Sequence, residues 1–163
     1  MTPVIEVVQA DYGNSQHAQD LVYLLDAYAA DPMGGGTPLA EAVKSSLVAE
    51  LAKRDFALSV LAYVNGKPAG LLNAFEGFST FAAKPLINIH DVIVLKAFRG
   101  LQLSQKLLSA VEELARARGC CKITLEVLSG NEAAKNAYLK FGFAGYVLDP
   151  EVGQALFWQK KLV

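Results

Sequence analysis

The chain has 163 residues, of which 53% are hydrophobic and 19% are charged, and its formal net charge is −1. This length and composition predict a single domain over residues 1–163 with its own core, and they exclude a disordered chain. The balanced charge provides no excess of basic residues that would bind nucleic acid, so no nucleic-acid partner is expected. No apolar run reaches the length of a membrane span, so no membrane partner is expected. The first residues also lack the basic and apolar regions of a secretory signal.

Periodicity and turn residues divide the chain into short strands and amphipathic helices. Asp31-Pro32 ends the first helix, because the residue before proline is disfavoured in the α region. Thr37-Pro38 is expected to open the second helix, and Asn65-Gly66 is a strong hairpin signal. In chain order, the predicted elements are a strand at residues 4–8, helices at 16–29 and from residue 37, strands at 56–64, 69–78 and 86–94, a helix at about 101–118, a strand at 122–128, a helix at 131–141, and strands at 143–148 and 155–162.

The order β-α-α-β-β-β-α-β-α-β-β predicts an α/β fold of the α+β type, with a mixed, twisted central sheet flanked by helices. Strands 86–94 and 122–128 should be parallel, because a crossover helix joins them. The glycine-rich run Met33-Gly34-Gly35-Gly36 predicts a flexible loop, either a plain connector or a mobile flap over a substrate.

Cys120 and Cys121 are adjacent and are the two cysteines of the chain. Neighbouring strand residues point to opposite faces, so no disulfide between them is expected, and they lack the further ligands of a metal site. This cysteine usage indicates a reducing, cytoplasmic location.

The segment from Arg99 to Ser104 follows a strand and opens a long amphipathic helix. A helix N-terminus presents unpaired backbone N–H groups and a partial positive charge, so it can bind a phosphate. On spacing alone, an ordinary strand–helix loop is the simpler interpretation.

Further motifs surround this turn at fixed spacing. They are Val92-Ile93-Val94, Phe98-Arg99-Gly100, Leu107-Leu108, Asn131, Ala134, Tyr138 and Gly142-Phe143. With these motifs, residues 85–143 resemble the core of the GNAT superfamily of acyl-CoA N-acyltransferases. Residues 77–81 and 90–94 are similar, less specifically, to its diamine acetyltransferase branch. Gln102 and Ser104 depart from the pattern, because they stand where the family has glycines that let a pyrophosphate approach the backbone.

The resemblance implies an enzyme that transfers an acetyl group from acetyl-CoA to the primary amine of a small molecule, such as a polyamine or an amino acid, by direct attack. It implies that acetyl-CoA is bound by Val92, Ile93, Val94, Arg99, Gly100, Leu101, Gln102, Leu103, Ser104, Asn131 and Tyr138. A non-catalytic acyl-CoA-binding module, or an enzyme acting on a protein N-terminus or lysine, are the alternatives.

The catalytic residues implied are Tyr138, as the general acid that protonates the leaving thiolate, and either Asp91 or His90 as the base. Tyr138 could instead be a core tyrosine, and His90 with Asp91 a structural hydrogen-bonded pair. Tyr28, Asp31 and Glu76 could line an amine pocket. Phe157 and Trp158 indicate a core or a subunit interface, and a homodimer is expected.

Overall fold

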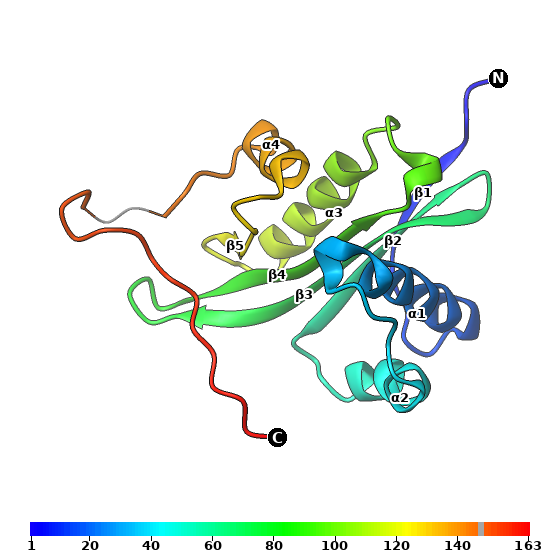
Figure 1. The fold of residues 1–163 in the computed structure, drawn as a ribbon, viewed down its shortest axis with the longest axis horizontal. Coiled ribbons are helices and arrows are strands. Elements are labelled where there is room, and N and C mark those ends of the chain that lie inside the picture. Colours follow the sequence, from blue (N-terminus) through cyan, green and yellow to red (C-terminus); the bar gives the residue numbers. More distant parts are fainter. Residues whose placement is uncertain (147–148) are drawn as a thin grey trace.

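Five strands form one mixed sheet in the order β1-β2-β3-β4-β5 (Figure 1). The structure is a computed structural model that describes residues 1–146 and 149–163. The pairs β1–β2, β2–β3 and β3–β4 are antiparallel, and the pair β4–β5 is parallel. The predicted mixed sheet and its parallel crossover are therefore confirmed. The strands are β1 (Ile5–Gln9), β2 (Ala57–Val64), β3 (Lys67–Ser79), β4 (Lys84–Val94) and β5 (Ile123–Leu125).

Helices cover both faces of the sheet, as expected for strands that are apolar on both sides (Figure 1). One core cluster packs the sheet against α3 and α4, and the other packs it against α1 and α2. None of the described helices is long and apolar enough to cross a bilayer. The helices are α1 (Ser15–Ala30), α2 (Glu41–Ala52), α3 (Leu103–Ala117) and α4 (Glu132–Phe141), with short 3-10 turns η1 (Pro32–Gly34) and η2 (Lys96–Phe98).

The amphipathic pattern of α3 buries five residues against the sheet: Leu103, Leu107, Leu108, Val111 and Ala115. A fully buried leucine stabilises the fold by about 1.5–3 kcal/mol relative to an exposed one. Gly70 of β3 allows the helix to come this close, because a Cβ there would lie 3.2 Å from Leu107 Cδ1 and 3.1 Å from the Ile93 carbonyl oxygen.

The link between α1 and α2 differs from the prediction. The Leu39 N–H donates to Asp26 Oδ1 at 2.8 Å, so the chain stays extended and α2 begins at Glu41 instead of Thr37. The glycine-rich run is a hydrogen-bonded turn: the N–H of Gly36 donates to the Asp31 carbonyl at 2.9 Å. A Cβ at Gly34 would lie 2.0 Å from the Tyr28 carbonyl oxygen, so this position requires glycine.

The prediction of two C-terminal strands is wrong for the described residues 143–146 and 155–162, and residues 147–148 lie outside the described part of the chain. The apolar alternation is present, but a strand also needs a partner strand. None of the described residues of this segment pairs with the sheet. The last residues of the chain run past the β3–β4 turn without joining the sheet (Figure 1). Their large apolar side chains, such as Phe157 and Trp158, are exposed. Strand β5 is likewise shorter than the 122–128 expected.

Candidate active site

Strand β4 separates from β5 halfway along its length. The two strands pair only from Ile87 to Ile89, opposite β5, whereas β4 continues to Val94. The β3–β4 ladder shifts register at the same place, since Asn73 pairs with Asp91 but Ala74 pairs with Ile89. His90 is therefore the extra residue of a β-bulge, which bends and twists the strand. The bulge lies where β4 leaves its parallel neighbour and its edge becomes free.

A cleft of about 1080 Å³ lies beside this free part of β4. It is walled by four parts of the fold: the end of β4, the turn and first residues of α3, the inner face of α4, and the end of α1 with η1. Of the residues implied by sequence for acetyl-CoA and for the amine, the lining contains Val92, Ile93, Val94, Arg99, Gly100, Gln102, Leu103, Ser104, Asn131, Tyr138, Tyr28 and Asp31. Leu101 lines the adjoining hollow with Lys106 and Ser109.

The free edge of β4 presents backbone donors to the cleft. The Leu95 N–H donates to the Ala69 carbonyl at 2.9 Å, so it points toward β3. Because N–H directions alternate along a strand, Val92 and Val94 direct their N–H groups to the opposite edge, where the cleft lies. An extended ligand arm running beside β4 would find two donors there.

The N-terminus of α3 forms the other polar wall. Its first turn contains no acidic residue, and the side chain of Gln102 makes no capping hydrogen bond. Gln102 itself adopts a left-handed conformation, with φ 58°, at a position where glycine would be unstrained. The first backbone N–H groups of the helix are thus available to an anion, and Lys96, Arg99 and Lys140 line the same cleft. These donors and charges fit a pyrophosphate.

The charge of Asp91 acts on both Tyr28 and Tyr138. Burial raises the pKa of Tyr138, and the nearby Tyr28 and Asp91 raise it further. The pKa of Tyr28 is raised by burial and by the charges of Asp91 and Asp31. Asp91 is not itself a lining residue, but its charge reaches both tyrosines of the cleft. The structure thus brings together four of the residues expected for catalysis and amine binding.

A chain of buried hydrogen bonds holds the Asp91 carboxylate. Asn73 Nδ2 donates to Asp91 Oδ2 at 3.1 Å, and Ser59 Oγ donates to Asn73 Oδ1 at 2.6 Å. Tyr12 OH lies 2.9 Å from Ser59 Oγ and is the donor there, because the serine proton is already engaged. Each link donates toward Asp91. The sequence analysis missed Tyr12, Ser59 and Asn73, although two polar residues in the buried strands β2 and β3 could have indicated a network.

The surroundings of Asp91 set opposing influences on its acidity. Burial raises the pKa of the Asp91 carboxyl group above its ordinary value, whereas the hydrogen bond from Asn73 and the nearby His90 lower it in part. Burial is the largest of these influences. The carboxylate is consequently a stronger proton acceptor than an exposed aspartate.

His90 and Glu76 lie outside the cleft lining. The His90 side chain is exposed, and its ring packs edge-on against Phe75 with 4.9 Å between centroids. Glu76 forms an ion pair with Arg118 at 3.2 Å. Glu76, which the sequence analysis expected near an amine pocket, thus pairs with Arg118 and is not among the residues that line the cleft.

Helix α4 is fixed at two points. Asn131 Oδ1 accepts a hydrogen bond from the Ala134 N–H at 3.2 Å, so Asn131 caps the helix. Gln105 Nε2 donates to the Ala137 carbonyl at 2.9 Å and ties α4 to α3. These bonds hold Tyr138 at a fixed place relative to the N-terminus of α3.

The model of the acetyltransferase (GNAT) family matches residues 19–143, so the chain belongs to this family. The superfamily indicated by the sequence motifs is thereby confirmed, and with it an acyltransferase that uses acetyl-CoA. No curated protein sequence matches the chain significantly.

Solved structures share the fold. A probable acetyltransferase is 20% identical with a TM-score of 0.78, covering 96% of this chain and 99% of its own. The aminoglycoside N-acetyltransferase AAC(6')-Iy, in complex with CoA, is 16% identical with a TM-score of 0.76 and coverages of 99% and 97%. The ribosomal-protein-alanine N-acetyltransferase of Brucella melitensis biovar Abortus 2308 is 15% identical with a TM-score of 0.67 and coverages of 90% and 99%. At these identities the likeness shows a common fold.

Proposed function

We propose that the enzyme acetylates a primary amine of a small cationic molecule, of the polyamine or amino-acid type, with Tyr138 as the general acid. The observation that carries this proposal is the polarity of the cleft. Lys96, Arg99 and the N-terminus of α3 line it from one stretch of the chain, whereas Tyr28 and Asp31 line it from the end of α1 and the residue after it, where the charge of Asp91 also acts. The first set suits a pyrophosphate, and the second suits an ammonium group.

Acetyl-CoA, when bound, supplies the acetyl thioester that is transferred. The residues that would hold it are those of the free β4 edge and of the α3 turn. The N–H groups of Val92 and Val94 would bind the pantetheine arm and polarise the thioester carbonyl. The first N–H groups of α3, with Arg99, would bind the pyrophosphate.

On the amine side, Asp91 accepts a proton from the ammonium group, directly or through water, which leaves the amine nucleophilic. Its raised pKa suits this task better than that of an exposed carboxylate. Asp31 contributes a second negative charge that attracts a cationic substrate. His90 remains the alternative base, but its side chain is exposed and its ring packs against Phe75.

On the sulfur side, Tyr138 donates its phenolic proton as the carbon–sulfur bond breaks. Burial and neighbouring groups raise the pKa of Tyr138, so the phenol stays protonated at neutral pH. The nitrogen releases its second proton to solvent as the amide forms, and Tyr138 regains a proton from solvent after the thiol leaves.

The same proposal includes a homodimer working in a reducing cytoplasm. The free thiols of Cys120 and Cys121 support the compartment, and the exposed apolar tail beyond α4 supports the dimer.

The test is a thiol-release assay with acetyl-CoA and a panel of acceptors. The panel contains diamines, polyamines, amino acids, aminoglycosides, and peptides that offer an N-terminus or a lysine. We expect turnover with small acceptors that carry two or more positive charges, and little with peptides. Turnover confined to peptides would replace the small-molecule substrate by a protein, and no turnover with any acceptor would remove the proposed amine class.

A further inference from the structure

Four hydrogen-bonded side chains, called here the polar row, cross the sheet on the face that α1 and α2 cover. Ser59 of β2 is paired with Asn73 of β3, and Asn73 is paired with Asp91 of β4, so these three stand next to one another on adjacent strands. Tyr12 extends the polar row beyond Ser59, from the loop between β1 and α1. The polar row therefore leads from that loop to the carboxylate proposed as the base.

The polar row lies deep in the core. The next row of the same face consists of Leu61, Leu71 and Ile93, which are at most 3% exposed. Ser59 and Asn73 are similarly buried, at 1% and 5% exposed. Apolar side chains in their place would bury a similar area without removing polar atoms from water. Core stability alone does not explain the polar row, which indicates a task at its end.

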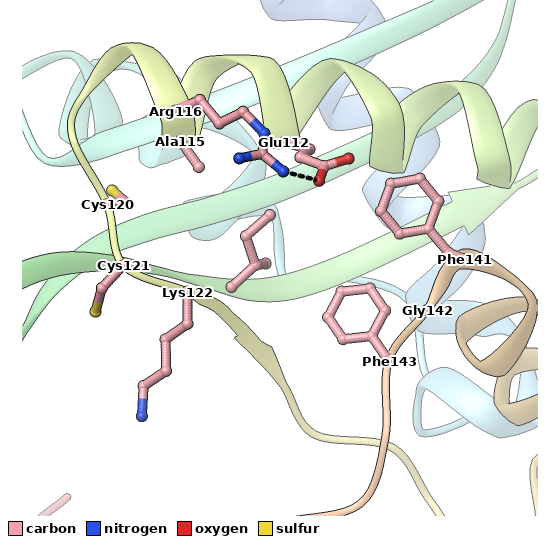
Figure 2. A pocket seen from close by; sticks show the side chains of 10 residues that line it. Glu112, Ala115, Arg116, Cys120, Cys121, Lys122, Phe141, Gly142 and Phe143 are labelled. Carbon is pink, nitrogen blue, oxygen red and sulfur yellow. Dashed lines mark hydrogen bonds and ion pairs between the residues drawn. The ribbon is translucent and has the colours of Figure 1, made fainter.

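On the other face of the sheet, polar groups are arranged differently. An open hollow of about 240 Å³ beside β5 has Phe141 and Phe143 in its wall, and Glu112 and Arg116 line it from α3 (Figure 2). These two charged groups form an ion pair with each other at 2.9 Å. They satisfy each other locally, whereas the bonds of the polar row follow one another and the last of them reaches Asp91.

The direction of the bonds in the polar row depends on its two ends. An ionised carboxylate only accepts, so Asn73 turns its Nδ2 toward Asp91 and its Oδ1 toward Ser59. The Ser59 hydroxyl can donate or accept, so it fixes no direction by itself. Tyr12 does fix one, because a phenol is a stronger donor and a weaker acceptor than an aliphatic hydroxyl.

Tyr12 remains a donor at neutral pH. Burial raises the pKa of the Tyr12 phenol, and its bond to Ser59 and the charge of Arg118 lower that pKa only in part. The phenol therefore stays protonated. Tyr12 is not among the residues that line the cleft, so it can act on the reaction only through Ser59 and Asn73.

We propose that Tyr12 is a positioning residue for Asp91. Its phenol donates to Ser59 Oγ, which commits the Ser59 proton to Asn73 Oδ1 and the Asn73 amide N–H to the carboxylate. The contrary arrangement would turn Asn73 Oδ1 toward Asp91, and it is favourable only when Asp91 carries a proton. Tyr12 thus favours the ionised carboxylate that can accept a proton. Its effect on turnover rests on the proposed role of Asp91 as the base.

Other groups around Asp91 stay in place when Tyr12 is altered. After burial and Asn73, His90 on the same strand is the third influence on the pKa of Asp91. The charge of Asp91 also acts on Tyr28 of α1, which Asp31 influences as well, and on Tyr138 of α4. A change of titration that follows a substitution of Tyr12 is therefore expected to pass along the polar row.

The test follows the Asp91 carboxyl carbon by NMR as pH is varied in the isotope-labelled enzyme without acetyl-CoA. In Tyr12→Phe we expect the Asp91 titration to move up by about half a pH unit, roughly a threefold gain in proton affinity, because the bond from Asn73 is weakened. Ser59→Ala cuts the polar row and should move the titration upward by at least as much. In that background, Tyr12→Phe should add less than about 0.1 pH unit.

Tyr63→Phe is the matched control. Tyr63 packs against the same core cluster, and its phenol donates to Asp20 Oδ2 at 2.7 Å, outside the polar row. This variant loses the same hydroxyl group and should leave the Asp91 titration unchanged.

Turnover supplies a second readout. The acid limb of kcat/KM should move with the NMR titration in Tyr12→Phe, whereas a purely structural role of Tyr12 would lower stability and leave both in place. The proposal is overturned if the Asp91 titration in Tyr12→Phe stays in place, moves downward, or moves equally in the Ser59→Ala background. A titration that moves while the limb of kcat/KM does not would support the polar row and contradict Asp91 as the base, so the two proposals fail separately.

Discussion

The two ends of the cleft are built in different ways. The end proposed for acetyl-CoA consists mainly of backbone N–H groups from one contiguous stretch, residues 92–104. The end proposed for the amine consists of side chains from α1, the link between α1 and η1, β4 and α4. They are those of Tyr28, Asp31, Asp91 and Tyr138. A site made of backbone tolerates changes of side chain, as Gln102 and Ser104 illustrate. Substitutions at the amine end should therefore lower turnover strongly, and those in the backbone cradle should alter affinity modestly.

The largest effect is expected for Tyr138→Phe, which removes the proposed acid and keeps the ring. General acid catalysis contributes about 10²–10⁴-fold, so we expect kcat to fall about 100-fold or more. Calorimetry should show CoA affinity within about threefold of the wild type, since the backbone donors are intact. Tyr146→Phe, at an exposed tyrosine, is the control. An unchanged kcat in the first variant would remove Tyr138 as the acid.

Asp91→Asn should separate activity from stability. We expect turnover to fall about 10–100-fold because the base is lost. The folded-state pKa of Asp91 is raised, so ionisation near neutral pH destabilises the native state, by about 1.4 kcal/mol for every tenfold increase in proton affinity. Tm of the variant should exceed that of the wild type at pH 7. The difference should shrink as pH falls through the folded-state pKa and vanish below the ordinary aspartate pKa of 3.8. A lower Tm at pH 7 would contradict the assignment of burial as the dominant influence.

Asn73→Ala should move the pH dependence of turnover. The hydrogen bond from Asn73 lowers the pKa of Asp91, so its removal raises that pKa and shifts the acid limb of kcat/KM to higher pH. We expect a loss of about threefold to tenfold at neutral pH, which corresponds to the roughly 1 kcal/mol of one hydrogen bond. Asn88→Ala is the control, because Asn88 bonds Thr124 at 2.9 Å and not Asp91. A limb that stays in place would show that Asp91 is not the titrating base.

Gln102→Gly should have the smallest effect and the opposite sign. Glycine removes the left-handed strain at φ 58° and lets an anion approach the backbone more closely, so CoA affinity should rise a few-fold. Unfolding free energy should change by less than about 0.5 kcal/mol, because relief of strain offsets the greater flexibility of the unfolded chain. Gln102→Ala keeps the strain and should gain nothing. Equal gains in both variants would place the effect in the lost side chain.

The backbone end of the cleft could be predicted from the sequence because its signals are local. Periodicity outlined α3, the turn from Arg99 to Ser104 marked its start, and Asn131 capped α4. The family motifs then added Tyr138, which is among the residues that line the cleft. Each of these features depends on residues within a few turns of one another.

The side-chain end could not be assembled in the same way. The hydrogen-bond chain to Asp91 joins Tyr12, Ser59 and Asn73 from three separate segments. The partner of Glu76, Arg118, is 42 residues distant in the sequence. The bulge at His90 could not be predicted from a local signal, because no glycine or proline stands beside this residue. In residues 155–162, apolar alternation indicated a strand. A strand also needs a partner strand, and the alternation does not show whether one lies beside these residues in the fold.

The most direct test of the two-ended cleft is the pair of KM values in Arg99→Ala and Asp31→Asn. Asparagine at position 31 can still accept the bond that Asp31 Oδ1 receives from the Met33 N–H at 3.0 Å, so the loop is preserved and only charge is lost. We expect Arg99→Ala to raise KM for acetyl-CoA about fivefold and leave KM for the amine unchanged, and Asp31→Asn to do the reverse. The division of the cleft into an anion end and an amine end would be contradicted if both variants raised the same KM. It would also be contradicted if Arg99→Ala raised KM for the amine and Asp31→Asn raised KM for acetyl-CoA.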